Sequence, residues 1–128
     1  MSINNSSLYL KGFTSQLTEF VTDLLLIYED NQKLITCQRN IDLLVKNNPK
    51  MLILNWKKYI TKYSKEIEEG DIEFFMNKDY KSDVGNKGSE YLVFIDEVKK
   101  IMTTMSEDNK NKVIKYIKNL NKLASLYN

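Results

Sequence analysis

Residues 13–28 read FTSQLTEFVTDLLLIY, and the apolar side chains in this stretch recur every three to four positions. The residues that set this spacing are Phe13, Leu17, Phe20, Val21, Leu24 and Tyr28. Because an α-helix has 3.6 residues per turn, this spacing places all of them on one face. The stretch therefore predicts a long amphipathic helix over residues 8–28, buried along one side.

The same apolar period continues through the rest of the chain, in segments bounded by residues that start or stop helices. Asp30 and Asn31 are both preferred N-cap residues and can open a second helix. That helix ends before Pro49, because the residue preceding a proline avoids the α region. Pro49 itself suits the first position of a third helix, and Gly70 is placed to end it. A further helix begins after Ser89, and Ser106, followed by two carboxylates, opens the last one.

The region between Gly70 and Ser89 is the least regular part of the sequence. Asp71 caps a short segment that is dense in aromatic residues, and residues 77–89 hold the polar and glycine residues typical of a loop. No stretch alternates cleanly enough between apolar and polar residues to demand a strand. We therefore expect one all-α domain over residues 1–128, a compact bundle of about five to six helices.

The charges are nearly balanced overall but segregated along the chain. The 19 basic and 17 acidic side chains give a formal net charge of +2, which does not by itself indicate a nucleic-acid-binding protein. Residues 31–65 nevertheless carry eight basic side chains against a single acidic one, whereas residues 66–84 carry seven acidic side chains against two basic ones. The chain is therefore nearly neutral overall, with its charges segregated by region of the sequence.

Cysteine content and hydropathy indicate where the protein acts. Cys37 is the single cysteine, so an intrachain disulfide cannot form and a reducing compartment is expected. The N-terminal residues lack the basic and apolar regions of a secretory signal. The longest apolar run covers residues 24–28, far short of the roughly 20 residues that span a bilayer. We expect an intracellular protein without membrane contact, and the heptad-like helix after Ser89 leaves a homo-oligomer open.

The residue types present speak against catalysis. The chain contains no histidine, which removes the commonest general base and the commonest zinc ligand. Asp79, Asp83 and Glu90 occupy the first, fifth and twelfth places of a calcium-loop window. However, Lys81 and Val84 stand where a ligand and a glycine are needed. We therefore predict no catalytic residue, no metal site and no cofactor, and the protein is not expected to be an enzyme.

The first functional hypothesis is a patch that docks a protein partner in the aromatic segment after Asp71. Its residues are Phe74, Phe75, Met76 and Tyr80. A short segment flanked by a loop rarely buries so many large apolar groups, and methionine and aromatic residues are favoured at binding surfaces. The alternative is structural: these side chains pin the loop to the bundle.

The second hypothesis is a nucleic-acid-binding accessory factor that uses the basic third helix. The candidate residues are Lys57, Lys58, Lys62 and Lys65, next to Trp56, Tyr59 and Tyr63. Lysines on one helix face can contact phosphates while aromatic rings stack on bases. However, these aromatic residues also follow the apolar spacing of the helix. If they pack into the core, the lysines form an ordinary solvated face.

Three stretches together carry a family resemblance. Residues 13–24, 70–80 and 105–120 read FTSQLTEFVTDL, GDIEFFMNKDY and MSEDNKNKVIKYIKNL. In that order they resemble a group of uncharacterised small proteins of nucleocytoplasmic large DNA viruses, of the mimivirus and phycodnavirus kind. The resemblance implies a giant-virus accessory or virion-associated protein, located in the host cytoplasm or the virion. It implies no activity and no catalytic residue.

Overall fold

A computed structural model of the chain describes residues 5–71, 73–74 and 89–127. Within these residues the main elements are α1 (Ser6–Ile27), α2 (Gln32–Asn47), α3 (Pro49–Tyr59), the 3-10 turn η1 (Thr61–Tyr63), α4 (Ser64–Glu68), α7 (Ser89–Met102) and α8 (Glu107–Leu126). The prediction of an all-α bundle is confirmed. All but the last residue of the predicted loop over residues 77–89 lie outside the described residues.

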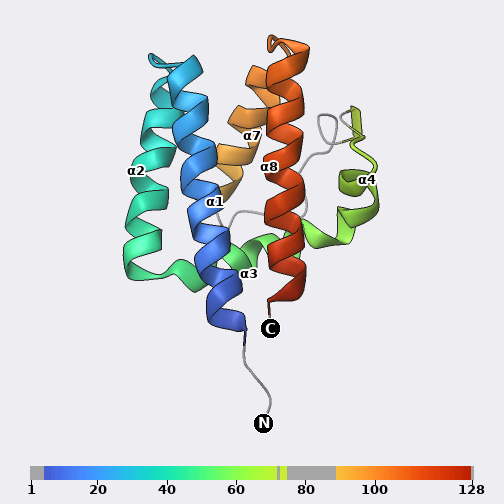
Figure 1. Cartoon of the computed structure of the whole chain (residues 1–128). Helices are drawn as coiled ribbons and strands as arrows, with labels where there is room; N and C mark the ends of the chain where they lie inside the picture. Colours follow the sequence, from blue (N-terminus) through green and yellow to red (C-terminus); the bar gives the residue numbers. More distant parts are fainter. Residues whose placement is uncertain (1–4, 72, 75–88, 128) are drawn as a thin grey trace.

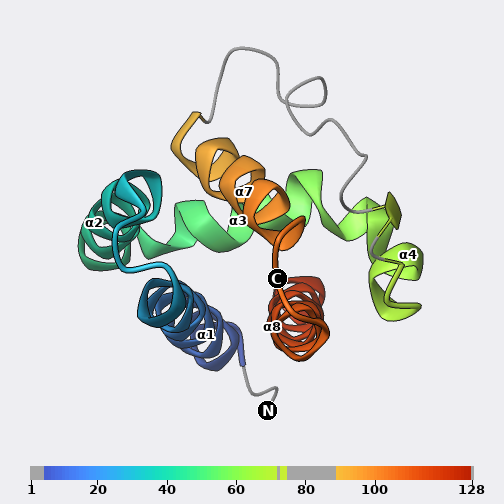
Figure 2. The same cartoon turned by 90° about the horizontal axis from the view of Figure 1, so that it is seen from above.

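The long helices stand side by side, and α3 runs across them near one end (Figure 1, Figure 2). α1 packs against α2, α3 and α8, while α2 packs against α3 and α7. α4 lies at the edge of the bundle and packs against α8. This arrangement places the first and last helices of the chain next to each other and antiparallel (Figure 1).

The core is built around the inward face of α1, as the spacing in residues 13–28 predicts. Phe13 contacts Trp56 of α3 edge to face, with ring centroids 5.9 Å apart. About two helical turns further along α1, Phe20 meets Phe94 of α7 in the same way at 5.5 Å. Such edge-to-face pairs stabilise a core beyond the area that they bury. Each of these contacts joins α1 to a helix far away in the sequence.

Two of the predicted helix starts are made by the side chains that the sequence indicated. The Asn31 Oδ1 atom accepts a hydrogen bond from the backbone N–H of Leu34 at 3.0 Å, so Asn31 caps α2. The Ser106 Oγ atom accepts one from the backbone N–H of Asn109 at 3.2 Å and caps α8. Each bond satisfies a donor that the first helical turn leaves without an intrahelical partner.

The prediction of one continuous helix from Pro49 to Gly70 is wrong, because the chain bends in the middle of this segment. α3 ends at Tyr59, and a 3-10 turn and the short α4 follow. Hydroxyl groups bond locally at this bend: Thr61 donates to the Lys57 carbonyl and Ser64 donates to the Thr61 carbonyl. Such bonds compete with the regular helix. The bend takes α4 away from the axis of α3 and packs it against α8, where Ile67 is buried.

Candidate functional site

The predicted docking patch after Asp71 is described only at its first residue. The Phe74 ring is half-buried and lies against the Tyr63 ring, with centroids 5.4 Å apart. Its backbone N–H donates to the Asp71 Oδ1 atom at 3.0 Å, which confirms the predicted cap. Phe74 is thus anchored to the bend after α3. The other three residues of the patch, Phe75, Met76 and Tyr80, lie outside the described residues.

The aromatic residues of the predicted nucleic-acid site point inward. Trp56 is 1% exposed, and its Nε1 atom donates to the Asn121 Oδ1 atom of α8 at 3.1 Å. Tyr59 and Tyr63 are half-buried and pack against the core. Trp56 therefore has a structural role, as its position on the core period indicated, and base stacking cannot use it without unfolding this region.

The four predicted lysines do not form one stripe, because the bend separates them. Lys57 donates to the carbonyl of Tyr127, the residue that follows α8. Lys58 lies over the ring of Tyr59 at 5.1 Å from its centroid. Lys62 lies over the Tyr63 ring at 5.3 Å, in η1, and Lys65 belongs to α4. These lysines therefore belong to three successive elements and not to the single continuous helix that the second hypothesis assumed.

The outer side of α3 carries a different set of exposed residues, which we call the α3 face: Lys50, Met51, Leu54 and Lys58. Lys50, Leu54 and Lys58 follow each other at steps of four residues, so they line up along one row of the helix. Met51 lies next to this row, three positions before Leu54. Leu54 is 49% exposed and Met51 is 40% exposed.

The surroundings of the α3 face are basic. Every charged residue from position 43 to position 65 is a lysine. Neither Lys50 nor Lys58 forms an ion pair with another described residue. The α3 face therefore combines solvent-exposed apolar side chains with positive charge that no described carboxylate pairs with. Sequence analysis missed it because Met51 and Leu54 do not belong to the aromatic cluster, although the four-residue spacing of Lys50, Leu54 and Lys58 was visible.

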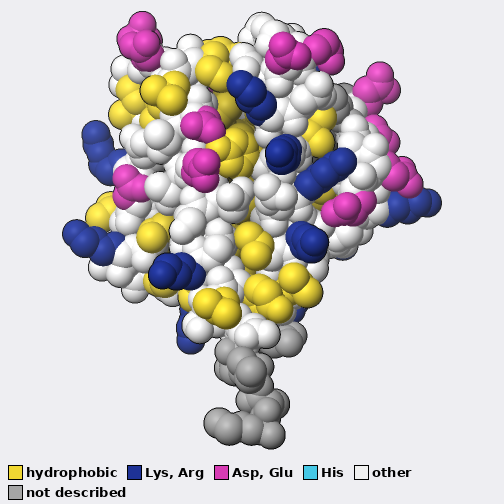
Figure 3. Space-filling model, viewed as in Figure 1, with side chains coloured by type: hydrophobic (Ala, Val, Ile, Leu, Met, Phe, Trp, Pro, Cys, Tyr) yellow, Lys and Arg dark blue, Asp and Glu magenta, His cyan; other side chains and the backbone are white. Residues whose placement is uncertain are grey.

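A groove with a volume of about 360 Å³ runs between α1 and α8 on the side of the bundle that faces the viewer in Figure 3. Its lining residues are Gln16, Glu19 and Asp23 from α1 and Lys112, Lys115, Tyr116 and Asn119 from α8. The acidic side chains thus come from one helix and the basic ones from the other. We call this feature the α1–α8 groove.

Tyr116 forms the floor of the α1–α8 groove. Its ring stacks on Phe20, with centroids 4.9 Å apart and an interplanar angle of 13°. Its hydroxyl donates to the Asp23 Oδ2 atom. Burial raises the pKa of Tyr116 above its ordinary value of 10.0, and the carboxylates of Asp23 and Glu19 raise it further. The phenol therefore keeps its proton and acts as a fixed donor to Asp23.

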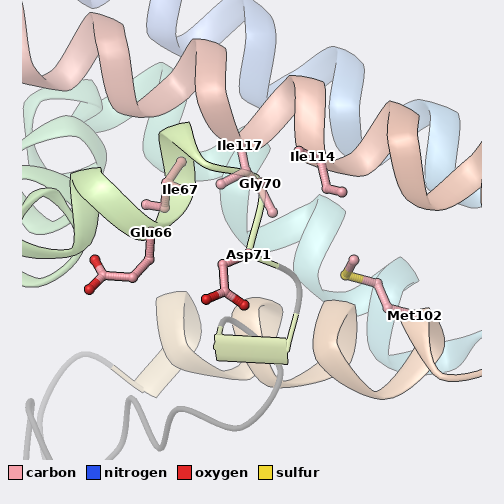
Figure 4. A pocket seen from close by; sticks show the side chains of 7 residues that line it. All are labelled: Glu66, Ile67, Gly70, Asp71, Met102, Ile114 and Ile117. Carbon is pink, nitrogen blue, oxygen red and sulfur yellow. The ribbon is translucent and has the colours of Figure 1, made fainter.

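A second hollow lies where α4, α7 and α8 meet (Figure 4). Ile67, Met102, Ile114 and Ile117 give it apolar walls, and the carboxylates of Glu66 and Asp71 point away from it (Figure 4). Its cavity volume is about 20 Å³. A volume of this size holds about one water molecule and no organic ligand. We therefore regard this hollow as a packing defect.

Comparison with protein-family models, with curated proteins and with solved structures finds no match to this chain. The resemblance to giant-virus proteins thus stays a prediction from the sequence. In the part of the chain that the structure describes, no helix has both the length and the apolarity needed to cross a membrane.

Proposed function

We propose that this protein is a non-enzymatic interaction module that docks an acidic, partly apolar segment of a protein partner on the α3 face. The observation that carries the proposal is the exposure of Leu54 between Lys50 and Lys58 on one row of a helix. The apolar side chain offers area to bury, and the two lysines on either side favour a partner with carboxylates at matching positions.

The apolar residues favour a protein partner over a nucleic acid. Fully burying a leucine or methionine side chain contributes about 1.5–3 kcal/mol, and an amphipathic protein segment can supply the apolar surface to do so. A phosphate backbone gives Leu54 and Met51 little to pack against, and it binds through charge alone. Trp56, the best stacking residue of the nucleic-acid hypothesis, is buried. We therefore keep nucleic-acid binding through Lys57, Lys58, Lys62 and Lys65 as the alternative, which the experiment below distinguishes from protein binding.

The setting that we propose is the interior of a cell, as an accessory or virion-associated protein of a giant virus. The support is the sequence resemblance, together with a single cysteine, Cys37, that is buried and belongs to no disulfide. A fold without a disulfide is suited to a reducing compartment.

The test measures binding of a synthetic amphipathic peptide built from leucine and glutamate, by fluorescence anisotropy at several salt concentrations. We expect Leu54→Ser to weaken binding of this peptide about tenfold or more, because about 1.4 kcal/mol of lost burial corresponds to one factor of ten. Lys58→Gln should weaken it less and reduce its salt dependence, because an exposed charge contributes at most about 1 kcal/mol.

Leu43→Ser is the matched control, since Leu43 lies on α2 and is 53% exposed, close to the value for Leu54. This variant should bind the peptide like the wild type. Equal weakening by both substitutions would contradict the α3 face as the docking site. A labelled DNA or RNA oligonucleotide is tested in parallel. If the oligonucleotide binds more tightly than the peptide, with a steep salt dependence and no effect of Leu54→Ser, the nucleic-acid alternative replaces the proposal.

A further inference from the structure

The two walls of the α1–α8 groove carry opposite charges, and these charges are not paired with each other. Glu19 and Asp23 stand on α1, and Lys112 and Lys115 stand on α8. None of these four groups forms an ion pair with another described residue. In Figure 3 acidic and basic side chains lie on either side of a partly apolar strip. The electrostatic potential therefore changes sign across the width of the groove, which suits a ligand with a charge of each sign.

The hydrogen bonds at the floor leave the acidic wall able to bind a cation. Tyr116 donates to Oδ2 of Asp23, which holds this carboxylate in place. A carboxylate has about four acceptor positions, so the Oδ1 atom of Asp23 keeps its capacity for a second donor. Glu19 lies one helical turn away on the same row of α1. Together they offer an ammonium group two carboxylates.

A pair of carboxamides bridges the two walls within the groove. The Asn119 Nδ2 atom donates to the Gln16 Oε1 atom over 3.4 Å, a long bond between exposed or half-buried groups. Each carboxamide carries both a donor and an acceptor, which match the C=O and N–H of a peptide bond. Because the bond is long and open to solvent, a ligand amide can replace it at little cost.

An apolar hollow with a volume of about 30 Å³ adjoins the charged part of the groove and shares three lining residues with it, Asp23, Lys112 and Tyr116. The apolar residues around it are Phe20, Leu24, Ile27, Met105 and Val113. This volume is only slightly larger than that of the hollow between α4, α7 and α8, so it admits no more than a terminal methyl group of a ligand. A ligand in the groove would thus bury a small apolar group next to its charged ends.

We infer that the α1–α8 groove binds a short zwitterionic peptide with an aliphatic side chain, its ammonium group at Glu19 and Asp23 and its carboxylate at Lys112 and Lys115. The length of such a ligand is comparable to the usual distance between two packed helices. Packed helix axes are about 8–10 Å apart, and an extended dipeptide or tripeptide spans about 7–11 Å at 3.3–3.6 Å per residue. In a free amino acid the ammonium and carboxylate groups are attached to the same carbon atom, so they lie closer together than the two ends of a dipeptide.

The test titrates the full chain with the dipeptide Gly-Leu and follows backbone amide signals by NMR. Two further probes lack one charge each, N-acetyl-Gly-Leu and Gly-Leu amide. We expect Gly-Leu to shift signals of residues that line the groove, and each single-charge probe to bind about two- to fivefold more weakly, as exposed ion pairs contribute up to about 1 kcal/mol.

Variants of the groove residues test which wall binds the ammonium group of the ligand and which binds its carboxylate. Asp23→Asn should weaken binding of Gly-Leu but leave binding of N-acetyl-Gly-Leu unchanged, because that probe has no ammonium group. Lys115→Gln should weaken binding of Gly-Leu but leave binding of Gly-Leu amide unchanged, because that probe has no carboxylate. Arg39→Gln removes an exposed charge from α2 and should change nothing. The inference is overturned if all three probes bind equally, if the shifted signals lie outside the groove, or if Gly-Leu causes no shift at its highest soluble concentration. Unchanged spectra of the free variants show that each one is folded.

Discussion

α8 makes polar contacts on two of its sides, and the two sets differ in burial. Toward α3 and the start of α4, Asn121 is 2% exposed, accepts from the Trp56 Nε1 atom at 3.1 Å and donates to the Ser64 Oγ atom at 3.0 Å. Toward α1, Tyr116 and Asn119 meet Asp23 and Gln16 at the edge of an open groove. The buried set fixes how α3 crosses the bundle, whereas the open set can exchange its partners for those of a ligand.

The physical reason for this difference is the access of water. A buried donor that loses its acceptor costs the full desolvation energy of that group, about 1–3 kcal/mol. A donor in an open groove exchanges one partner for water and loses far less. The hydrogen bonds of α8 therefore contribute to stability in the buried set, whereas those at the open groove can exchange their partners with solvent.

The largest effect is expected for Asn121→Leu. The substitution removes the acceptor of the Trp56 N–H and the donor to Ser64 from a buried site, and should lower the free energy of unfolding by about 2–4 kcal/mol. Urea unfolding followed by circular dichroism measures this loss. The double variant with Trp56→Phe and Asn121→Leu should lose less stability than the sum of the two single losses. The reason is that Trp56→Phe removes the buried N–H donor that Asn121→Leu leaves without an acceptor. A loss below about 0.5 kcal/mol for Asn121→Leu would contradict the structural role of the buried set.

An intermediate effect is expected for Asn31→Ala, at a contact that is partly buried. Asn31 caps α2 and also donates through Nδ2 to the Glu97 Oε2 atom of α7 at 2.8 Å, where Glu97 is 6% exposed. Losing the cap and this link should cost about 1–2 kcal/mol in urea unfolding. Asn31→Ser keeps a capping oxygen and loses only the amide, so it should cost less. Equal losses for both variants would mean that the cap contributes nothing.

The smallest effect at neutral pH is expected for Tyr116→Phe. The ring stays stacked on Phe20, and water can take the place of the hydroxyl beside Asp23, so the free energy of unfolding should change by less than about 0.5 kcal/mol. A loss above about 1 kcal/mol would mean that this contact stabilises the fold as the buried Asn121 bonds do. It would contradict the difference between the buried and the open contacts of α8.

The same variant tests the raised pKa of Tyr116 in alkaline solution. The folded protein keeps this proton at a pH where the unfolded chain, with an ordinary pKa of 10.0, has lost it. The stabilisation is therefore complete below about pH 10 and is lost as the pH rises from there toward the folded-state pKa. Thermal unfolding between pH 9 and pH 11 should show wild-type stability falling more steeply than that of Tyr116→Phe. Parallel curves would show that the pKa of Tyr116 is not raised.

Much of the fold could be predicted because its signals are local. Asn31, Pro49 and Ser106 mark helix starts by their own backbone chemistry, and the spacing of residues 13–28 marks the buried face of α1. The bend after Tyr59 could not be predicted in the same way. The apolar period runs through it unbroken, and the hydroxyls of Thr61 and Ser64 are weak signals against that pattern. The bend forms because it allows α4 to pack against α8, which is a contact between segments far apart in the sequence.

The candidate sites were harder to predict because they depend on which helices are neighbours. Glu19 and Asp23 form an acidic row on α1, and Lys112 and Lys115 form a basic row on α8, about 90 positions later in the sequence. Nothing local to either row indicates that the two helices lie side by side. The α3 face was also hard to predict, because the lysines beside Trp56 are the stronger local signal, and the bend after Tyr59 then separates those lysines.

The pairing of α1 with α8 also has a consequence for folding. These two helices come from opposite ends of the chain, so their contact closes a loop that contains nearly all other elements (Figure 1). The entropy lost in closing a loop grows with the logarithm of its length, and folding slows as contacts become more distant in sequence. Linking the start of α1 to the end of α8 and opening the chain elsewhere would make this contact local, and such a circular permutant should fold faster than the natural order of helices.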